Sequence, residues 1–128
     1  MKVPNLLSTS IFVLVISLAG CKNENPKELI VNKWKLKELI PSRTMQMPDS
    51  VKEKMLNSAT MEFMSDNKYT LTGMGAPKNG TYSISDDGKL LNINSSATQT
   101  TYVDTIIELT RNKLIIIDQM GNKLTSTN

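Results

Sequence analysis

Apolar residues recur at every second position in short runs from Thr60 to the C-terminus. This period of two is typical of β-strands that bury one face and leave the other in water. Polar segments typical of hairpin turns separate the runs, among them Asp86-Asp87-Gly88-Lys89 and Gly121-Asn122. The pattern predicts strands at about residues 60–65, 69–74, 80–85, 90–95, 100–110, 114–119 and 123–127.

A further strand precedes these within Leu29 to Ile40, where Trp34 and Leu36 alternate with lysines. Pro41 is expected to end it, and residues 29–32 are expected to form a short helical turn that plugs one end of the fold. About eight short strands joined mostly by tight turns can remove their unpaired edges by closing into a barrel. We therefore predict an all-β domain over residues 29–128, a small up-and-down antiparallel barrel.

One short helix is expected over residues 48–58, between the first and second strands. Ser50 and Glu53 have the spacing of a capping box, which predicts Ser50 as the N-cap. Val51 and Met55 are four residues apart and share a face of this helix, which needs cover from another element because the helix is short.

The alternation also predicts which side chains point into the barrel. On most strands the inward residues are Met61, Phe63, Tyr69, Leu71, Tyr82, Ile84, Leu91, Ile93, Leu114 and Ile116. On the strand over 100–110 they are Val103, Thr105, Ile107 and Leu109. The opposite face of that strand carries Asp104 and Glu108, which are expected to stay in water.

The first twenty residues have the composition of an export signal. Lys2 gives a positive start, and the run from Leu6 to Ala19 carries no charge. The run is too short to span a bilayer as a helix, which needs about 20 residues, but it suits a signal peptide.

The sequence Leu18-Ala19-Gly20-Cys21 resembles the lipobox of bacterial lipoproteins. The resemblance implies cleavage between Gly20 and Cys21 and diacylation of Cys21, the only cysteine in the chain. An ordinary secretory signal with an incidental cysteine is the alternative. Under the lipobox interpretation, residues 1–20 are the signal peptide and residues 21–28 are a lipidated tether to the outer membrane. Attachment to the periplasmic face and attachment to the surface face of that membrane are both alternatives.

A second resemblance covers roughly residues 29–127. The segment from Leu29 to Leu36, with Trp34 after an aliphatic run, is similar to the opening of lipocalin-like lipoprotein domains of Bacteroidetes, although Asn32 stands where those domains usually have glycine. Similar segments follow in the same order at 66–69, 80–84, 87–91 and 107–114. The resemblance implies a barrel in the cell envelope and does not imply a ligand.

Composition argues against several function classes. The chain has no histidine, which removes the commonest general base and the commonest metal ligand. Met45-Gln46-Met47 resembles the Met-x-Met pairs of copper proteins, but such a site would need a third methionine from elsewhere in the chain. The net charge of +3 is too small and too scattered for nucleic acid. We expect that the protein is not an enzyme, holds no metal or cofactor and is a monomer.

Ser50, within Asp49-Ser50-Val51, is a candidate O-glycosylation site.

The leading hypothesis is a membrane-anchored binding module for a small apolar ligand or an envelope partner. The alternative is an accessory subunit of an envelope assembly, with a filled barrel. If the barrel is open, an uncharged or amphipathic ligand is expected, because no inward residue is charged. A cavity below ~300 Å³ would exclude a drug-sized ligand and would favour the accessory-subunit alternative. The candidate ligand-binding residues are Trp34, Met61, Phe63, Tyr69, Tyr82 and Ile107.

Overall fold

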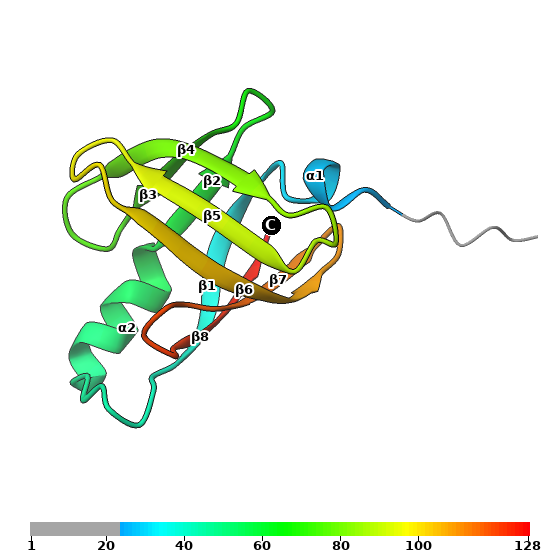
Figure 1. Cartoon of the computed structure of the whole chain (residues 1–128). Coiled ribbons are helices and arrows are strands. Elements are labelled where there is room, and N and C mark those ends of the chain that lie inside the picture. The colour runs from blue at the N-terminus through cyan, green and yellow to red at the C-terminus, as the bar shows by residue number, and fades with distance from the viewer. Residues whose placement is uncertain (1–23) are drawn as a thin grey trace, which may run out of the picture.

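A computed structural model describes residues 24–128. Eight strands follow one another around a closed barrel, each antiparallel to the next, and the first strand pairs with the last (Figure 1). The strands are β1 (Asn32–Ile40), β2 (Thr60–Phe63), β3 (Lys68–Thr72), β4 (Lys78–Ile84), β5 (Leu90–Ser95), β6 (Thr101–Leu109), β7 (Lys113–Ile117) and β8 (Lys123–Thr127). This arrangement confirms the predicted all-β, up-and-down barrel.

The predicted turn residues make the hydrogen bonds that such turns need. In the β4–β5 turn, the Asp87 carboxylate accepts from the Ser85 hydroxyl at 2.6 Å and from the Lys89 N–H at 3.0 Å. These bonds lower the pKa of Asp87, the one to Ser85 most, because they stabilise its charged form. Gly88 follows with a φ of +71°, which an L side chain rarely adopts. Local side-chain chemistry therefore fixes this hairpin.

A short helix, α1 (Pro26–Leu29), lies at one end of the barrel (Figure 1). Asn25 caps it, since its side chain accepts a hydrogen bond from the Lys27 N–H. Ile30, directly after the helix, is fully buried. A helical turn is thus present, but it spans 26–29 and not the predicted 29–32, and only Ile30 after it is buried. Ordered structure therefore extends into the segment predicted to be a tether.

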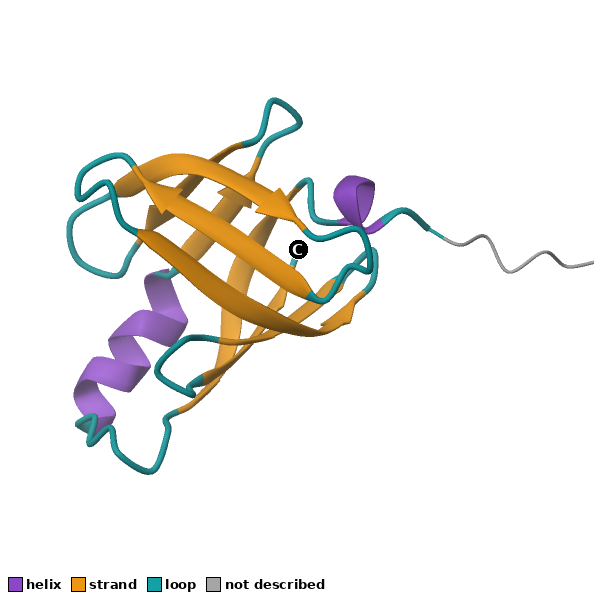
Figure 2. Cartoon of the chain, in the orientation of Figure 1, coloured by secondary structure: helices purple, strands orange, loops and turns teal. Residues whose placement is uncertain are grey.

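The predicted helix between β1 and β2 is α2 (Asp49–Ser58), at the opposite end of the barrel from α1 (Figure 2). The predicted N-cap is wrong. Pro48 occupies that position with no side-chain cap, and Ser50 lies inside the first turn. Proline supplies a fixed φ and no donor at a helix start, so it can end the preceding loop without a capping side chain. Met55 packs against a second small cluster that contains Leu36.

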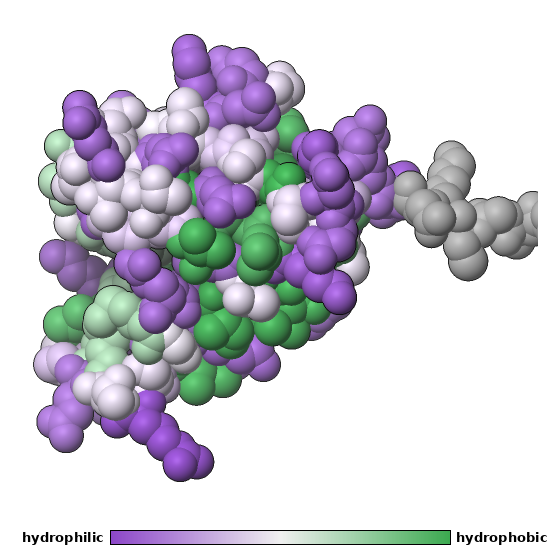
Figure 3. Space-filling view, in the orientation of Figure 1, coloured by the Kyte–Doolittle hydropathy of each residue, from purple (hydrophilic) through white to green (hydrophobic). Residues whose placement is uncertain are grey.

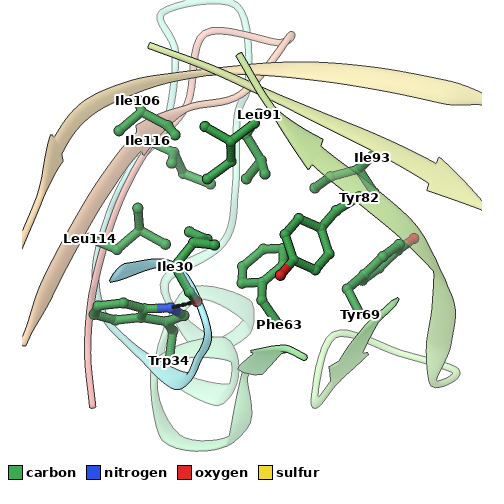
Figure 4. Close-up of a cluster of buried hydrophobic side chains, with 11 residues drawn as sticks. Ile30, Trp34, Phe63, Tyr69, Tyr82, Leu91, Ile93, Ile106, Leu114 and Ile116 are labelled. Atoms are coloured by element: carbon green, nitrogen blue, oxygen red, sulfur yellow. Dashed lines mark hydrogen bonds between the residues drawn. The ribbon is translucent and has the colours of Figure 1, made fainter. Parts of the chain in front are cut away.

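The core fills the half of the barrel nearest α1. Its buried side chains come from every strand except β8, together with the residue after α1 (Figure 4). They are Ile30, Trp34, Phe63, Tyr69, Tyr82, Ile84, Leu91, Ile93, Ile106, Leu114 and Ile116. The rings of Phe63 and Tyr82 meet edge to face, with centroids 4.8 Å apart. Apart from β6, the predicted inward faces are confirmed.

The predicted face of β6 is wrong at three of its four positions. Val103 and Ile107 are 44% and 57% exposed, and Thr105 also points outward. Tyr102, Asp104 and Ile106 face inward instead. A bulge between Ile106 and Glu108 then shifts the register, so Leu109 points inward as predicted.

No helix between residues 24 and 128 combines the length and the apolar composition needed to cross a membrane. The predicted signal peptide, the cleavage site at Gly20 and the lipidated Cys21 lie outside the described residues.

Candidate functional site: a cavity at the mouth of the barrel

A cavity of about 230 Å³ opens at the end of the barrel opposite α1. The turns before β4, before β6 and before β8 surround its mouth. Its wall is mainly apolar, and the aliphatic and thioether side chains are Met61, Leu71, Met74, Ile93, Ile116, Met120 and Leu124. Its volume lies below the ~300 Å³ of an ordinary drug-binding pocket, which excludes a drug-sized ligand and counts in favour of the accessory-subunit alternative. It lies above the ~150 Å³ of an apolar cavity that holds benzene, so a smaller ligand fits.

Asp104 is the most buried charged residue in this wall, and its carboxylate oxygens keep some contact with solvent at the mouth. The residue is 7% exposed and points inward from β6. Burial, and secondarily the negative charge of Asp118, raise its pKa to about 6. Among the described residues, no group donates a hydrogen bond to its carboxylate and no cation pairs with it. A carboxylate is costly to bury in this way, and such groups cluster at functional sites.

The carboxylate of Asp118 is held differently, although it lines the same cavity. One of its oxygens accepts from the backbone N–H groups of Met120 and Asn122, and the other accepts from the Asn122 side chain, each at 2.9 Å. Asp118 therefore builds the β7–β8 turn. It contributes negative charge to the mouth, but its hydrogen-bonding capacity is largely used.

Two tyrosines, Tyr69 and Tyr102, and Ser95 supply the hydroxyl groups of the wall. Burial raises the pKa of Tyr69, and the adjacent Ser95 hydroxyl partly offsets that rise. Tyr69 is neutral at physiological pH, so its hydroxyl can both donate and accept hydrogen bonds. The exposed Lys78 completes the rim.

The six predicted ligand-binding residues lie in three places: the cavity wall, the core and the outer face of the barrel. Met61 and Tyr69 line the cavity. Trp34, Phe63 and Tyr82 pack in the filled half of the barrel, where the Tyr82 hydroxyl donates to the Met64 carbonyl oxygen at 2.7 Å.

The remaining predicted ligand-binding residue, Ile107, lies outside the barrel at the β6 bulge, so its predicted place in a barrel lining is wrong. Asp104 was missed. Its one sequence signal is that it shares a period of two with Tyr102 and Ile106.

The structure adds no support for a metal site at Met45 and Met47 or for O-glycosylation of Ser50. No cluster of three or more Asp, Glu or Cys side chains with metal-binding geometry occurs in residues 24–128. Met47 packs against the second cluster beside α2, apart from the cavity. Ser50 is exposed on α2 and stays a candidate for modification.

A second surface feature lies on the outside of β5 and β6. Leu90, Val103 and Ile107 are each more than two-fifths exposed. Figure 3 shows apolar side chains gathered on this face of the barrel. Large exposed apolar patches on soluble domains commonly mark interaction surfaces.

Known protein families and characterised proteins were compared with this sequence, and none of them matches it.

Proposed function

We propose that this protein is an outer-membrane-anchored lipoprotein whose lipocalin-like barrel binds a small, mainly apolar ligand in the mouth cavity. The observation that carries the proposal is the cavity itself, about 230 Å³ in volume and walled mainly by apolar side chains. An eight-stranded barrel is wide enough either to be packed solid or to hold one small ligand. Here Trp34 and Phe63 pack in the core near α1, and the cavity opens at the other end.

The dimensions of the cavity limit the ligand to one ring or a short chain with a polar group. Three methionines in the wall, Met61, Met74 and Met120, are flexible and polarisable, so they can adapt to irregular apolar shapes. The hydroxyl of Tyr69 can orient a polar end.

Anchoring follows from the resemblance of Leu18-Ala19-Gly20-Cys21 to a lipobox. Two or more acyl chains hold a protein firmly in a membrane, whereas a single chain holds it marginally. Cys21 lies three residues before Glu24, so an anchored barrel would stay within about 10 Å of the lipid surface at its α1 end, at ~3.3–3.6 Å per residue. The open mouth, at the other end, would then face away from the anchoring membrane.

Methionine methyl NMR on the full protein in detergent tests the binding proposal. Benzyl alcohol should shift the signals of Met61, Met74 and Met120 and leave Met45, which lies outside the cavity, unchanged. Leu71→Phe, which narrows the cavity, should weaken the response. Equal shifts at all four methionines, or none, would contradict a specific cavity site.

The accessory-subunit alternative is favoured by the exposed apolar face of β5 and β6. In that reading, Val103 and Ile107 contact a protein subunit of an envelope assembly. Native electrophoresis of solubilised membranes should then show a complex larger than the monomer. The double variant Val103→Ser, Ile107→Ser should dissociate it, and Leu71→Phe should not. A monomer in both wild type and variant would eliminate this alternative.

A further inference from the structure

We propose that the ligand of the mouth cavity carries a cationic amine, which pairs with the carboxylate of Asp104 while its apolar body contacts the cavity wall. This inference deepens the proposed function and depends on it. It replaces the uncharged or amphipathic ligand that the sequence predicts if Asp104 lies on the outer face.

The geometry around Asp104 carries the inference. Its side chain points into the cavity from β6 and is more than nine-tenths buried. Within residues 24–128 it has neither a cationic partner nor a hydrogen-bond donor. By contrast, Asp118 receives three hydrogen bonds from its own turn. The acceptor sites of Asp104 are therefore available to a ligand, and Asp118 adds negative potential without competing for the same contacts.

A metal ion fits this site less well than an amine does. Ca²⁺ takes six to eight oxygen ligands and Mg²⁺ an octahedral set. The wall offers only two carboxylates, and one of them is committed to its turn; the rest is largely apolar. An alkylammonium group needs a few acceptors and brings an apolar body, which matches one buried carboxylate beside Met61 and Leu71.

The other charged and titratable groups around Asp104 do not supply the missing cation. Lys78, at the start of β4, is exposed at the rim, and no ion pair joins it to Asp104. Tyr69 on β3 and Tyr102 on β6 offer hydroxyl groups and no cation, and Asp118 is an acidic side chain. Because the pKa of Asp104 is about 6, the carboxylate is mostly ionised at pH 7.5 and mostly protonated at pH 5.

The test compares benzylamine with benzyl alcohol, which have the same number of non-hydrogen atoms. Both are titrated into the full protein in the same detergent, with the Met61, Met74 and Met120 methyl signals as the readout. At pH 7.5, benzylamine should bind about tenfold or more tightly, as expected for a hydrogen bond to a charged group. Asp104→Asn should abolish that preference. Glu108→Gln, which removes a carboxylate from the same strand outside the cavity, should keep it.

The pH dependence of the preference for benzylamine over benzyl alcohol is a second test of the pairing with Asp104. The amine preference should decline several-fold between pH 7.5 and pH 5, whereas benzyl alcohol binding should change little. Equal affinity of both probes at pH 7.5 would overturn the amine inference and leave the cavity proposal intact. An amine preference that survives in Asp104→Asn would also overturn it. If neither probe binds, the proposed function itself fails.

Discussion

The indole Nε1 of Trp34 donates a hydrogen bond of 2.9 Å to the carbonyl oxygen of Ile30. Both residues are fully buried, and the bond joins β1 to the turn that follows α1 (Figure 4). It satisfies a carbonyl at the end of a short helix, where no intrahelical partner remains. This contact ties the residue after α1 to β1 at the α1 end of the barrel.

Trp34→Phe should therefore destabilise the protein. It leaves the buried Ile30 carbonyl oxygen without a donor and opens a small void, and together these should cost about 3 kcal/mol of the free energy of unfolding. Urea unfolding followed by circular dichroism measures the loss. Lys35→Ala, on the exposed face of the same strand, is the control and should change little. A cost for Trp34→Phe no larger than for the control would refute a structural role for this bond.

Gly80→Ala should weaken the contact between β4 and β5. A Cβ atom at residue 80 would lie 1.8 Å from the backbone oxygen of Asn94, so the strands would have to separate. We expect a loss of about 2 kcal/mol or more in the free energy of unfolding. Thr81→Ala, on the outer face of the same strand, should have a much smaller effect. Equal stability of Gly80→Ala and wild type would mean that the strands are not so closely apposed.

Asp104 should make the stability of the barrel depend on pH. Its pKa is about 6 in the folded protein, against 3.8 for an ordinary aspartate, so between these values the folded state binds more protons than the unfolded state. Its favourable contribution is complete below pH 4 and is lost as the pH rises through 6. Asp104→Asn should thus be more stable than wild type at pH 7.5 by up to about 2 kcal/mol, allowing for solvent at the mouth.

The difference between wild type and Asp104→Asn should shrink toward zero near pH 4, in denaturant unfolding measured across the pH range. The comparison between the two proteins cancels the titration of the other carboxylates. A difference independent of pH would show that the Asp104 carboxyl does not titrate differently in the folded state.

Local patterns predicted most of this fold. Alternation assigns a face on each strand where only one phase is apolar, as with Met61 and Phe63. Turn residues such as Asp87 act through hydrogen bonds to neighbours a few residues away, so the sequence contains their whole context. The start of α1 also had a local signal, since asparagine followed by proline is a common helix opening.

The side chains that define the cavity depended on tertiary context. Both faces of β6 carry apolar side chains. The cost of burying a charge favoured the orientation that places Asp104 outside the barrel. Pairing with β5 places Asp104 opposite the inward Leu91, and the bulge at Ile107 then returns Leu109 to the inside. The water-accessible mouth makes an inward carboxylate tolerable. The general rule that charged side chains stay in water does not hold for Asp104 at the mouth, and for this reason the sequence did not predict the site.

Cys21→Ala should release the protein from the membrane, because the thiol that would take the lipid is gone. Fractionation of cells, with immunodetection of the barrel domain, measures this. Cys21→Ser offers the same test with a closer side chain. Either variant remaining in the membrane fraction as firmly as wild type would contradict anchoring through Cys21.

Native mass spectrometry of the protein, extracted gently from its own membrane at pH 7.5, tests the central claim most directly. We expect a chain that begins at Cys21, carries covalent acyl mass and retains a small noncovalent ligand. Excess benzylamine should displace that ligand, and Asp104→Asn should lack it. A protein with neither acyl mass nor a retained ligand, which also fails to take up benzylamine, would contradict the account of an anchored barrel with a ligand in its mouth.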